Sequence, residues 1–107
     1  MDDKTFDALI TKIWRRLTDG IDAKDPDRVE ATATPDMVTV EFANGHSCVI
    51  NTQRAVHQVW VAAQGRGLHF DWHAEEGEWK DDKGQGLELL RFVTDVVLAE
   101  CGERVRF

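Results

Sequence analysis

The spacing of the apolar residues changes twice along the chain, and these changes restrict the possible folds more than any other feature. Near the N-terminus the apolar residues recur at steps of three and four, which places them on one face of a helix: Phe6, Leu9, Ile10, Ile13, Trp14, Leu17 and Ile21. From residue 29 the period becomes two, as in half-buried strands, and a helical spacing returns from about Leu87 to Ala99. This order predicts an α+β fold in which the N- and C-terminal helices pack on one face of a five- to six-stranded antiparallel sheet.

The ends of the two predicted helices carry recognisable signals. Asp2 and Asp3 stand where an N-cap and the helix dipole favour carboxylates, and the first helix ends at Gly20 or continues one turn to Ile21. Gly102 is expected to end the second helix. The buried stripe of this second helix is predicted to contain Leu87, Leu90, Val93, Val96 and Val97, and Val105 and Phe107 of the tail are expected to pack on the core.

Turn residues divide the central region into strands. Asn44-Gly45 predicts a two-residue hairpin turn, because both residues tolerate positive φ. A strand is expected from about His57 to Ala63, followed by a turn at Gly65-Arg66-Gly67. A short last strand would hold Trp79 before a turn at Asp82-Lys83-Gly84.

Length and charge limit the classes of function. The 107 residues predict one domain spanning 1–107, with 42% apolar and 31% charged residues, as in globular proteins. No apolar run reaches the roughly 20 residues that span a bilayer, so a membrane protein is not expected. The net charge of −7 disfavours nucleic acid as a partner and favours cations or a basic protein surface. The acidic start predicts a cytoplasmic protein whose Cys48 and Cys101 are reduced thiols.

Strand parity exposes a polar face of the predicted sheet. If Val59 and Val61 point to the core, Gln58 and Trp60 point the other way. The same argument directs Asn51 and Gln53 outward from the preceding strand. Tryptophan is a frequent anchor of protein interfaces, so this face is a candidate partner-binding surface. The alternative is that neighbouring side chains or a loop simply shield Trp60.

A cluster of carboxylates follows the first helix. It consists of Asp19, Asp22, Asp25, Asp27 and Glu30, the last on the first predicted strand. Oxygen ligands suit hard cations such as Ca²⁺, Mg²⁺, Mn²⁺ and iron, but the spacing does not match an EF-hand loop. Exposed carboxylates without a cage bind metal weakly, and from spacing alone a solvated acidic face is the better interpretation.

His69-x-Asp71-x-His73 offers a secondary metal-binding possibility on one outward strand face. Residues two apart on a strand diverge by nearly 7 Å, so another segment would have to supply further ligands. The sequence contains no nucleophile–base pair and no phosphate-binding glycine loop that spacing supports. We therefore expect no enzymatic activity.

Several segments together resemble the frataxin family, most closely its bacterial CyaY branch. They cover essentially the whole chain: Phe42–Gly45, Val49–Gln53, His57–Ala62, Gly67–Trp72, Trp79, Gly84, Leu87–Leu90 and Gly102–Val105. The resemblance implies a frataxin-like α/β sandwich with weakly bound Fe²⁺ or Fe³⁺ and no tightly bound cofactor. It also implies a role in iron–sulfur cluster assembly, by docking on the cysteine desulfurase and scaffold complex.

The resemblance assigns roles to the two candidate surfaces. It places the iron-binding acidic ridge on Asp19, Asp22, Asp25, Asp27 and Glu30, and the partner contacts of the sheet on Asn51, Gln53, Gln58 and Trp60. Lys24 and Arg28 interrupt a segment that is often almost continuously acidic in relatives, so weaker iron binding is expected. We expect a monomer that supplies iron or regulates the desulfurase. The alternatives are a pure regulator with incidental metal binding and a ferroxidase or iron store.

Overall fold

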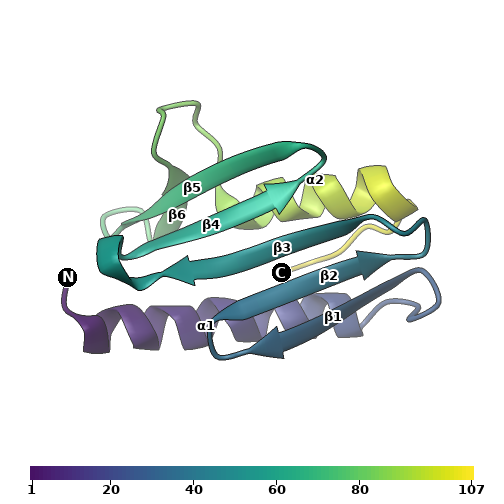
Figure 1. Cartoon of the computed structure of the whole chain (residues 1–107), viewed down its shortest axis with the longest axis horizontal. Coiled ribbons are helices and arrows are strands. Elements are labelled where there is room, and N and C mark those ends of the chain that lie inside the picture. The colour runs from purple at the N-terminus through teal and green to yellow at the C-terminus, as the bar shows by residue number, and fades with distance from the viewer.

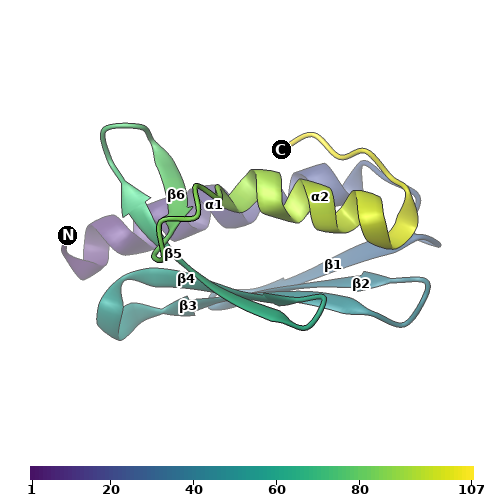
Figure 2. The same cartoon turned by 90° about the horizontal axis from the view of Figure 1, so that it is seen from above.

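Six strands form one antiparallel sheet in which each strand pairs with the next one in the chain (Figure 1). The computed structural model describes all residues from 1 to 107. The elements are α1 (Asp3–Asp22), β1 (Val29–Thr34), β2 (Met37–Phe42), β3 (Ser47–Gln53), β4 (Gln58–Ala63), β5 (Arg66–His73), β6 (Glu78–Asp81) and α2 (Leu89–Cys101). Both helices lie on the same side of the sheet, as Figure 2 shows, which confirms the predicted α+β architecture. No helix is both long and apolar enough to cross a membrane.

Helix α1 begins where the sequence predicts. The Asp2 carboxylate accepts a hydrogen bond from the backbone N–H of Thr5 at 2.7 Å, so one of the unpaired amides of the first turn is satisfied. The helix continues through Gly20 to Asp22, the longer of the two predicted lengths. Gly20 is buried beside Phe107 of the C-terminal tail, because the tail crosses the helix there.

Helix α2 starts at Leu89, two residues later than predicted. Glu88 is the N-cap, and its carboxylate accepts hydrogen bonds from the N–H groups of Leu90 and Arg91. Leu87 lies before the helix rather than on it, and both Leu87 and Leu90 pack against the core as half-buried residues. The buried residues are instead Leu89, Phe92, Val93, Val96 and Val97. The left-handed Gly102 ends the helix as expected, with φ of 75°.

Three predicted strand ends are displaced in the structure. The β2–β3 connection spans residues 43–46, and only Gly45 has a positive φ, so the two-residue turn is wrong. The β4–β5 turn is Gln64-Gly65, with φ of 53° and 73°, whereas the residues 66–67 expected in the turn belong to β5. His57 does not begin β4, because it ends a 3₁₀ turn (Arg54–Val56) in the left-handed conformation.

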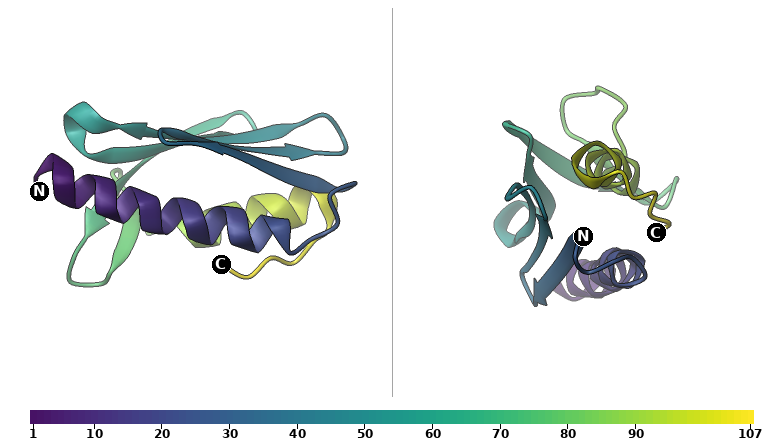
Figure 3. Two further views of the ribbon diagram at one scale, coloured as in Figure 1. Left: turned by 90° about the horizontal axis from the view of Figure 1, so that it is seen from below. Right: turned by 90° about the vertical axis from the view of Figure 1, so that its right-hand side faces the viewer.

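One hydrophobic core fills the space between the sheet and the two helices. It takes alternate residues from the strands, including Val59, Val61 and Phe70, together with the apolar stripes of both helices. Val105 joins this core and Phe107 packs against it, as expected for the tail. The end of β5, β6 and the connection between them rise from the sheet on the helix side (Figures 2 and 3).

Candidate functional site

The five carboxylates of the acidic ridge lie at one end of the molecule, where α1 ends and the edge strand β1 begins. Asp19 and Asp22 are in the last turn of α1, Asp25 and Asp27 in the connection, and Glu30 in β1. All five side chains are exposed. The chain reverses direction at this point, as the left view of Figure 3 shows, and therefore brings helix, loop and strand carboxylates to one surface.

The connection between α1 and β1 is an ordered turn. The backbone carbonyl of Asp25 accepts hydrogen bonds from the N–H groups of Arg28 and Val29 at 3.0 and 3.1 Å. The Asp25 carboxylate accepts a further bond from the N–H of Asp27 at 2.9 Å. One oxygen of Asp25 thus stabilises the turn, while the carboxylates of Asp22 and Glu30 make no such internal bond.

A hollow of about 350 Å³ lies between the end of α1 and β1. Asp22 and Glu30 both line it, together with Lys24, whereas the other three ridge residues lie outside its lining. No three His, Cys, Asp or Glu side chains of the protein gather in an arrangement that could enclose a metal ion. The ridge fits an open surface that holds hydrated cations weakly, with oxygen donors of the hard type.

The two cations of the ridge segment behave differently. Arg28 forms an ion pair with Glu103 rather than with a ridge carboxylate, and its Nη1 atom lies 3.1 Å from Oε1 of Glu103. Lys24 has no ion-pair partner and borders the hollow beside Asp22 and Glu30. The charge of the ridge is therefore reduced by one neighbouring lysine rather than by both cations.

Trp60 belongs to β4, an inner strand of the sheet, and the sheet face that no helix covers faces the viewer in Figure 1. Its indole stacks on the imidazole of His69 in β5, with ring centroids 4.1 Å apart and planes 13° apart. The indole N–H donates to Oε1 of Gln58 at 2.9 Å. These contacts leave Trp60 half-buried, so neighbouring side chains do shield one side of it without covering it.

Gln58 connects this pair to two carboxylates. Its amide Nε2 donates to Asp71 of β5 at 3.0 Å and to Asp82, just beyond β6, at 3.3 Å. Asp82 also approaches Nδ1 of His69, at 3.4 Å. Four residues predicted from two separate arguments therefore belong to one network with Asp82: Gln58, Trp60, His69 and Asp71. We call these five residues the Trp60 network.

The other predicted residues of this face border the Trp60 network. Asn51 pairs with Trp60 and Gln53 with Gln58 in the β3–β4 register, and both are half-buried. His73 is exposed and pairs with Glu78 of β6, so it does not join His69 and Asp71 around a common point. The side chains of His69 and Asp71 are already engaged by the residues of β4.

Sequence reasoning missed Asp82 and the pairing of Trp60 with His69. The pairing follows from the turn: with Gln64-Gly65 at the tip, Trp60 stands opposite His69 and Gln58 opposite Asp71. The predicted turn at residues 65–67 lies further along the chain and would pair other residues of β4 and β5. The signal that could have found it is the Gln64-Gly65 dipeptide itself, a two-residue hairpin with glycine at its second position.

Comparison with known proteins gives consistent results. A model of the frataxin-like domain matches residues 1–103. The iron-sulfur cluster assembly protein CyaY of Tolumonas auensis is 36% identical over 105 residues, covering 98% of this chain and 97% of the relative. The protein of the same name from Psychromonas ingrahamii is 31% identical over 107 residues, covering 100% of this chain and 98% of the relative.

A solved structure agrees with these sequence relatives. The frataxin from Psychromonas ingrahamii, described as a member of the CyaY protein family, superposes with a TM-score of 0.88 at 30% sequence identity. The match covers 98% of this chain and 96% of the other. With the family model, the relatives and the fold in agreement, the chain belongs to the frataxin-like family, among its bacterial CyaY members.

Proposed function

We propose that this protein is a non-enzymatic accessory of iron–sulfur cluster assembly that holds iron weakly on the acidic ridge and docks on the cysteine desulfurase and scaffold complex. The names of the relatives support the assembly role. The observation that carries the proposal is the ridge, where helix, turn and edge strand present five exposed carboxylates with one unpaired lysine among them.

Iron is cargo in this proposal rather than a resident cofactor. Fe²⁺ accepts oxygen ligands and keeps exchangeable water, and the clustered negative charge raises its local concentration. Asp22 and Glu30, which share the hollow, are the residues that would contact the ion first. Because no closed ligand set surrounds them, iron held here remains free to leave toward a partner.

Docking uses both surfaces in different ways. The ridge attracts a basic surface over a distance of about 10 Å at ordinary ionic strength, which raises the association rate. Trp60 supplies a rigid aromatic contact of the kind that dominates binding energy at interfaces. Asn51, Gln53 and Gln58 surround it with amides that provide hydrogen bonds.

Charge reversal tests the docking surface. Asp22→Lys combined with Glu30→Lys should weaken desulfurase binding at least tenfold at 0.15 M salt, measured by isothermal titration calorimetry. The matched control reverses two exposed carboxylates elsewhere, Glu75→Lys with Asp95→Lys, and changes the net charge equally. Equal loss in both variants would show that only net charge matters, and unchanged binding would refute ridge docking.

Iron binding is tested by an anaerobic amide NMR titration with Fe²⁺. Paramagnetic broadening confined to residues 19–30 is the expected result. Broadening centred on residues 69–73 would move the site to the sheet face. No selective broadening at millimolar iron would remove iron from the proposal and leave docking.

A second candidate function is a pure regulator of the desulfurase, for which metal is incidental. The lack of three converging ligands favours it. In that case Trp60→Ala changes the desulfurase rate equally with and without iron, while ridge substitutions that abolish iron binding but retain docking leave the rate unchanged. A rate effect that requires iron would instead support the iron-dependent role.

A further inference from the structure

A hollow of about 250 Å³ on the helix side of the molecule belongs to neither of the surfaces described above. It lies between α1, the β5–β6 hairpin and the first turn of α2, where Figure 2 shows the hairpin rising past α1. Five apolar side chains contribute to its lining: Leu9, Ile13, Trp72, Trp79 and Leu90. The volume is below the roughly 300–1,000 Å³ of pockets for drug-sized ligands, so a ligand here is small.

Two of the four indole N–H groups have no acceptor within the protein, and both of these tryptophans line the hollow. Trp14 and Trp60 donate to protein acceptors, at 3.1 and 2.9 Å, whereas Trp72 and Trp79 donate to none. As a whole residue, Trp79 is only 2% exposed. Every fully buried side-chain nitrogen or oxygen of the protein has a hydrogen-bond partner, so the unpaired Nε1 atom of Trp79 is not fully buried. Its N–H therefore retains some exposure, and the hollow is the space that Trp79 lines.

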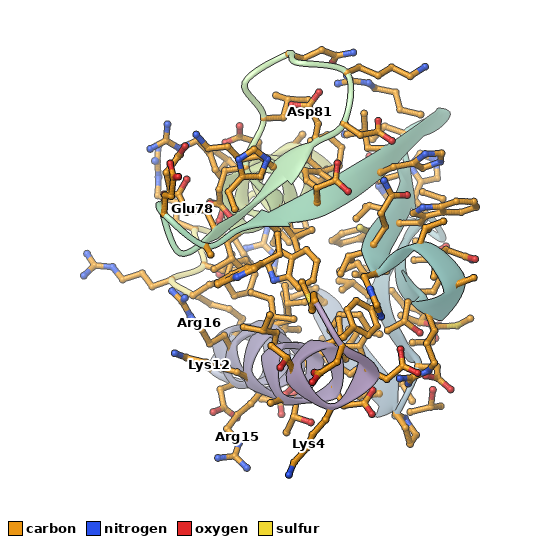
Figure 4. All side chains as sticks on the ribbon, turned by 90° about the vertical axis from the view of Figure 1, so that its left-hand side faces the viewer. Lys4, Lys12, Arg15, Arg16, Glu78 and Asp81 are labelled. Carbon is orange, nitrogen blue, oxygen red and sulfur yellow. The ribbon has the colours of Figure 1, made fainter.

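Charges of both signs border the same hollow. Lys12 and Arg16 stand one helical turn apart on α1, and Figure 4 shows them projecting on the same side of the molecule as Glu78 of β6. Lys12 and Glu78 form no ion pair within the protein, while Arg16 donates two hydrogen bonds to the backbone oxygen of Phe107, at 3.0 and 2.9 Å. An unpaired cation and an unpaired carboxylate thus lie at the borders of one apolar pocket.

The other two acidic side chains of the lining are already engaged. Glu76 forms an ion pair with Lys80, and Glu88 caps α2 through both of its carboxylate oxygens. Glu78 lies near the Lys80 ammonium but forms no ion pair with it, so both of its carboxylate oxygens remain open to a ligand. The wall formed by Lys12 therefore favours an anionic group, and the side formed by Glu78 favours a cationic one.

We propose that this hollow binds a small zwitterion, a free α-amino acid with an apolar side chain. Its carboxylate lies near the Lys12 ammonium and the free indole N–H groups, and its ammonium lies near Glu78. The apolar side chain covers Leu9, Ile13 and Leu90. A ligand with only one of the two charges gains one electrostatic contact and leaves the opposite charge unpaired, so it binds more weakly.

The four indole signals of a ¹H–¹⁵N NMR spectrum provide the test, with L-leucine as the probe. Leucine has few heavy atoms, so affinity in the millimolar range is expected. The N–H signals of Trp72 and Trp79 should shift, while those of Trp14 and Trp60, already hydrogen-bonded, serve as internal controls. Trp14→Phe, Trp60→Phe and Trp72→Phe variants assign three of the signals, and the fourth is that of Trp79. Absence of a shift up to 50 mM leucine overturns the proposal.

Two leucine derivatives and three variants define the ligand class. N-acetyl-L-leucine lacks the ammonium and L-leucinamide lacks the carboxylate, and each should bind at least fivefold more weakly than leucine. Lys12→Met and Glu78→Gln should each weaken leucine binding about fivefold, as expected for a partly exposed charged hydrogen bond. Arg15→Met removes a neighbouring exposed cation of α1 that does not line the hollow, and should change nothing. Equal binding of leucine and N-acetyl-leucine would show an anion pocket and refute the zwitterion.

Discussion

The indole of Trp60 and the imidazole of His69 lie parallel at 4.1 Å on the face of the sheet that faces solvent. The two residues are direct cross-strand partners, so the β4–β5 register brings the rings together. A half-buried tryptophan on the open face of the sheet is thereby held in one orientation. Such preorganisation reduces the entropy lost when a partner binds, and it makes Trp60 better suited to an interface than a freely rotating side chain.

Replacing the histidine should loosen this tryptophan. His69→Ala removes the stacked ring and is expected to lower the free energy of unfolding by about 1 kcal/mol, the usual contribution of an aromatic pair. Urea unfolding measures this loss, and faster hydrogen exchange of the Trp60 indole should accompany it. His73→Ala, on the same strand but away from Trp60, is the control and should have less than half the effect. Equal losses would show that the stack is energetically unimportant.

Gly20 should resist replacement although it lies within a helix. A Cβ atom at this position would be 2.5 Å from Cδ1 of Phe107 and 3.0 Å from the carbonyl oxygen of Arg106. The helix propensity of alanine favours Gly20→Ala by about 1 kcal/mol, but overpacking costs typically 1–3 kcal/mol. We expect a net loss of about 1 kcal/mol in urea unfolding.

A double variant separates the two contributions at Gly20. In a Phe107→Ala background the ring is absent, so Gly20→Ala should become neutral or stabilising. If Gly20→Ala destabilises both backgrounds equally, the contact with Phe107 is not the cause.

Asp81 makes stability depend on pH. The backbone N–H groups of Gln85, Leu87 and Lys83 donate to its carboxylate and hold its pKa below the ordinary value of 3.8. Because the pKa in the folded state is lowered, the stabilisation is complete above about pH 3.8 and disappears as the pH falls through the lowered value. Asp81→Asn should therefore unfold at lower urea concentration than the native protein at pH 7, and this difference should shrink below pH 3.8.

The exposed Asp95→Asn variant is the control for this pH dependence. It removes a carboxylate of α2 that lies on the surface and should not change the acid dependence of unfolding. A difference between Asp81→Asn and the native protein that stays constant from pH 7 to pH 3 would contradict the role given to the carboxylate.

The two thiols should differ in reactivity. Burial raises the pKa of Cys48 to about 12, so almost no thiolate forms at pH 8, whereas Cys101 is half-buried near the end of α2. Iodoacetamide should label one thiol of the folded protein, identified by mass spectrometry as Cys101. In a Cys101→Ser variant, labelling should require unfolding. Labelling of Cys48 at the rate of Cys101 would contradict its burial.

Repulsion within the acidic ridge should reduce stability at low ionic strength. Asp22→Asn is expected to raise the free energy of unfolding by a few tenths of a kcal/mol in 10 mM salt, and the gain should disappear in 0.5 M salt. Mg²⁺ should raise the melting temperature of the native protein more than NaCl of equal ionic strength, because bound cations stabilise the folded state. If Mg²⁺ and NaCl act identically, the ridge does not bind divalent cations.

Local patterns were sufficient to predict most of the architecture. The stripe from Phe6 to Ile21 and the period of two in the strands depend on side-chain spacing alone, so helix, sheet and the outward position of Trp60 could be inferred. The start of α2 could not be inferred, because a helix cap depends on contacts of the neighbouring chain. Glu88 caps the helix, while the backbone N–H of Leu87 donates to the carboxylate of Asp81. The left-handed conformation of His57 could likewise not be inferred, because a positive φ is uncommon for non-glycine residues even though histidine is enriched among them.

The sequence by itself determined the order of elements, the buried face of each strand and the carboxylates that a ridge could use, because these follow from the periods of the chain. The tertiary structure decided which distant residues meet. A hairpin tip at Gln64-Gly65 rather than further along the chain places His69 against Trp60. The packing of β6 beside α1 brings Glu78 and Lys12 to one hollow, although 65 residues separate them in the chain. Such contacts depend on strand register and on how the layers pack, and neither is encoded in the spacing of a single segment.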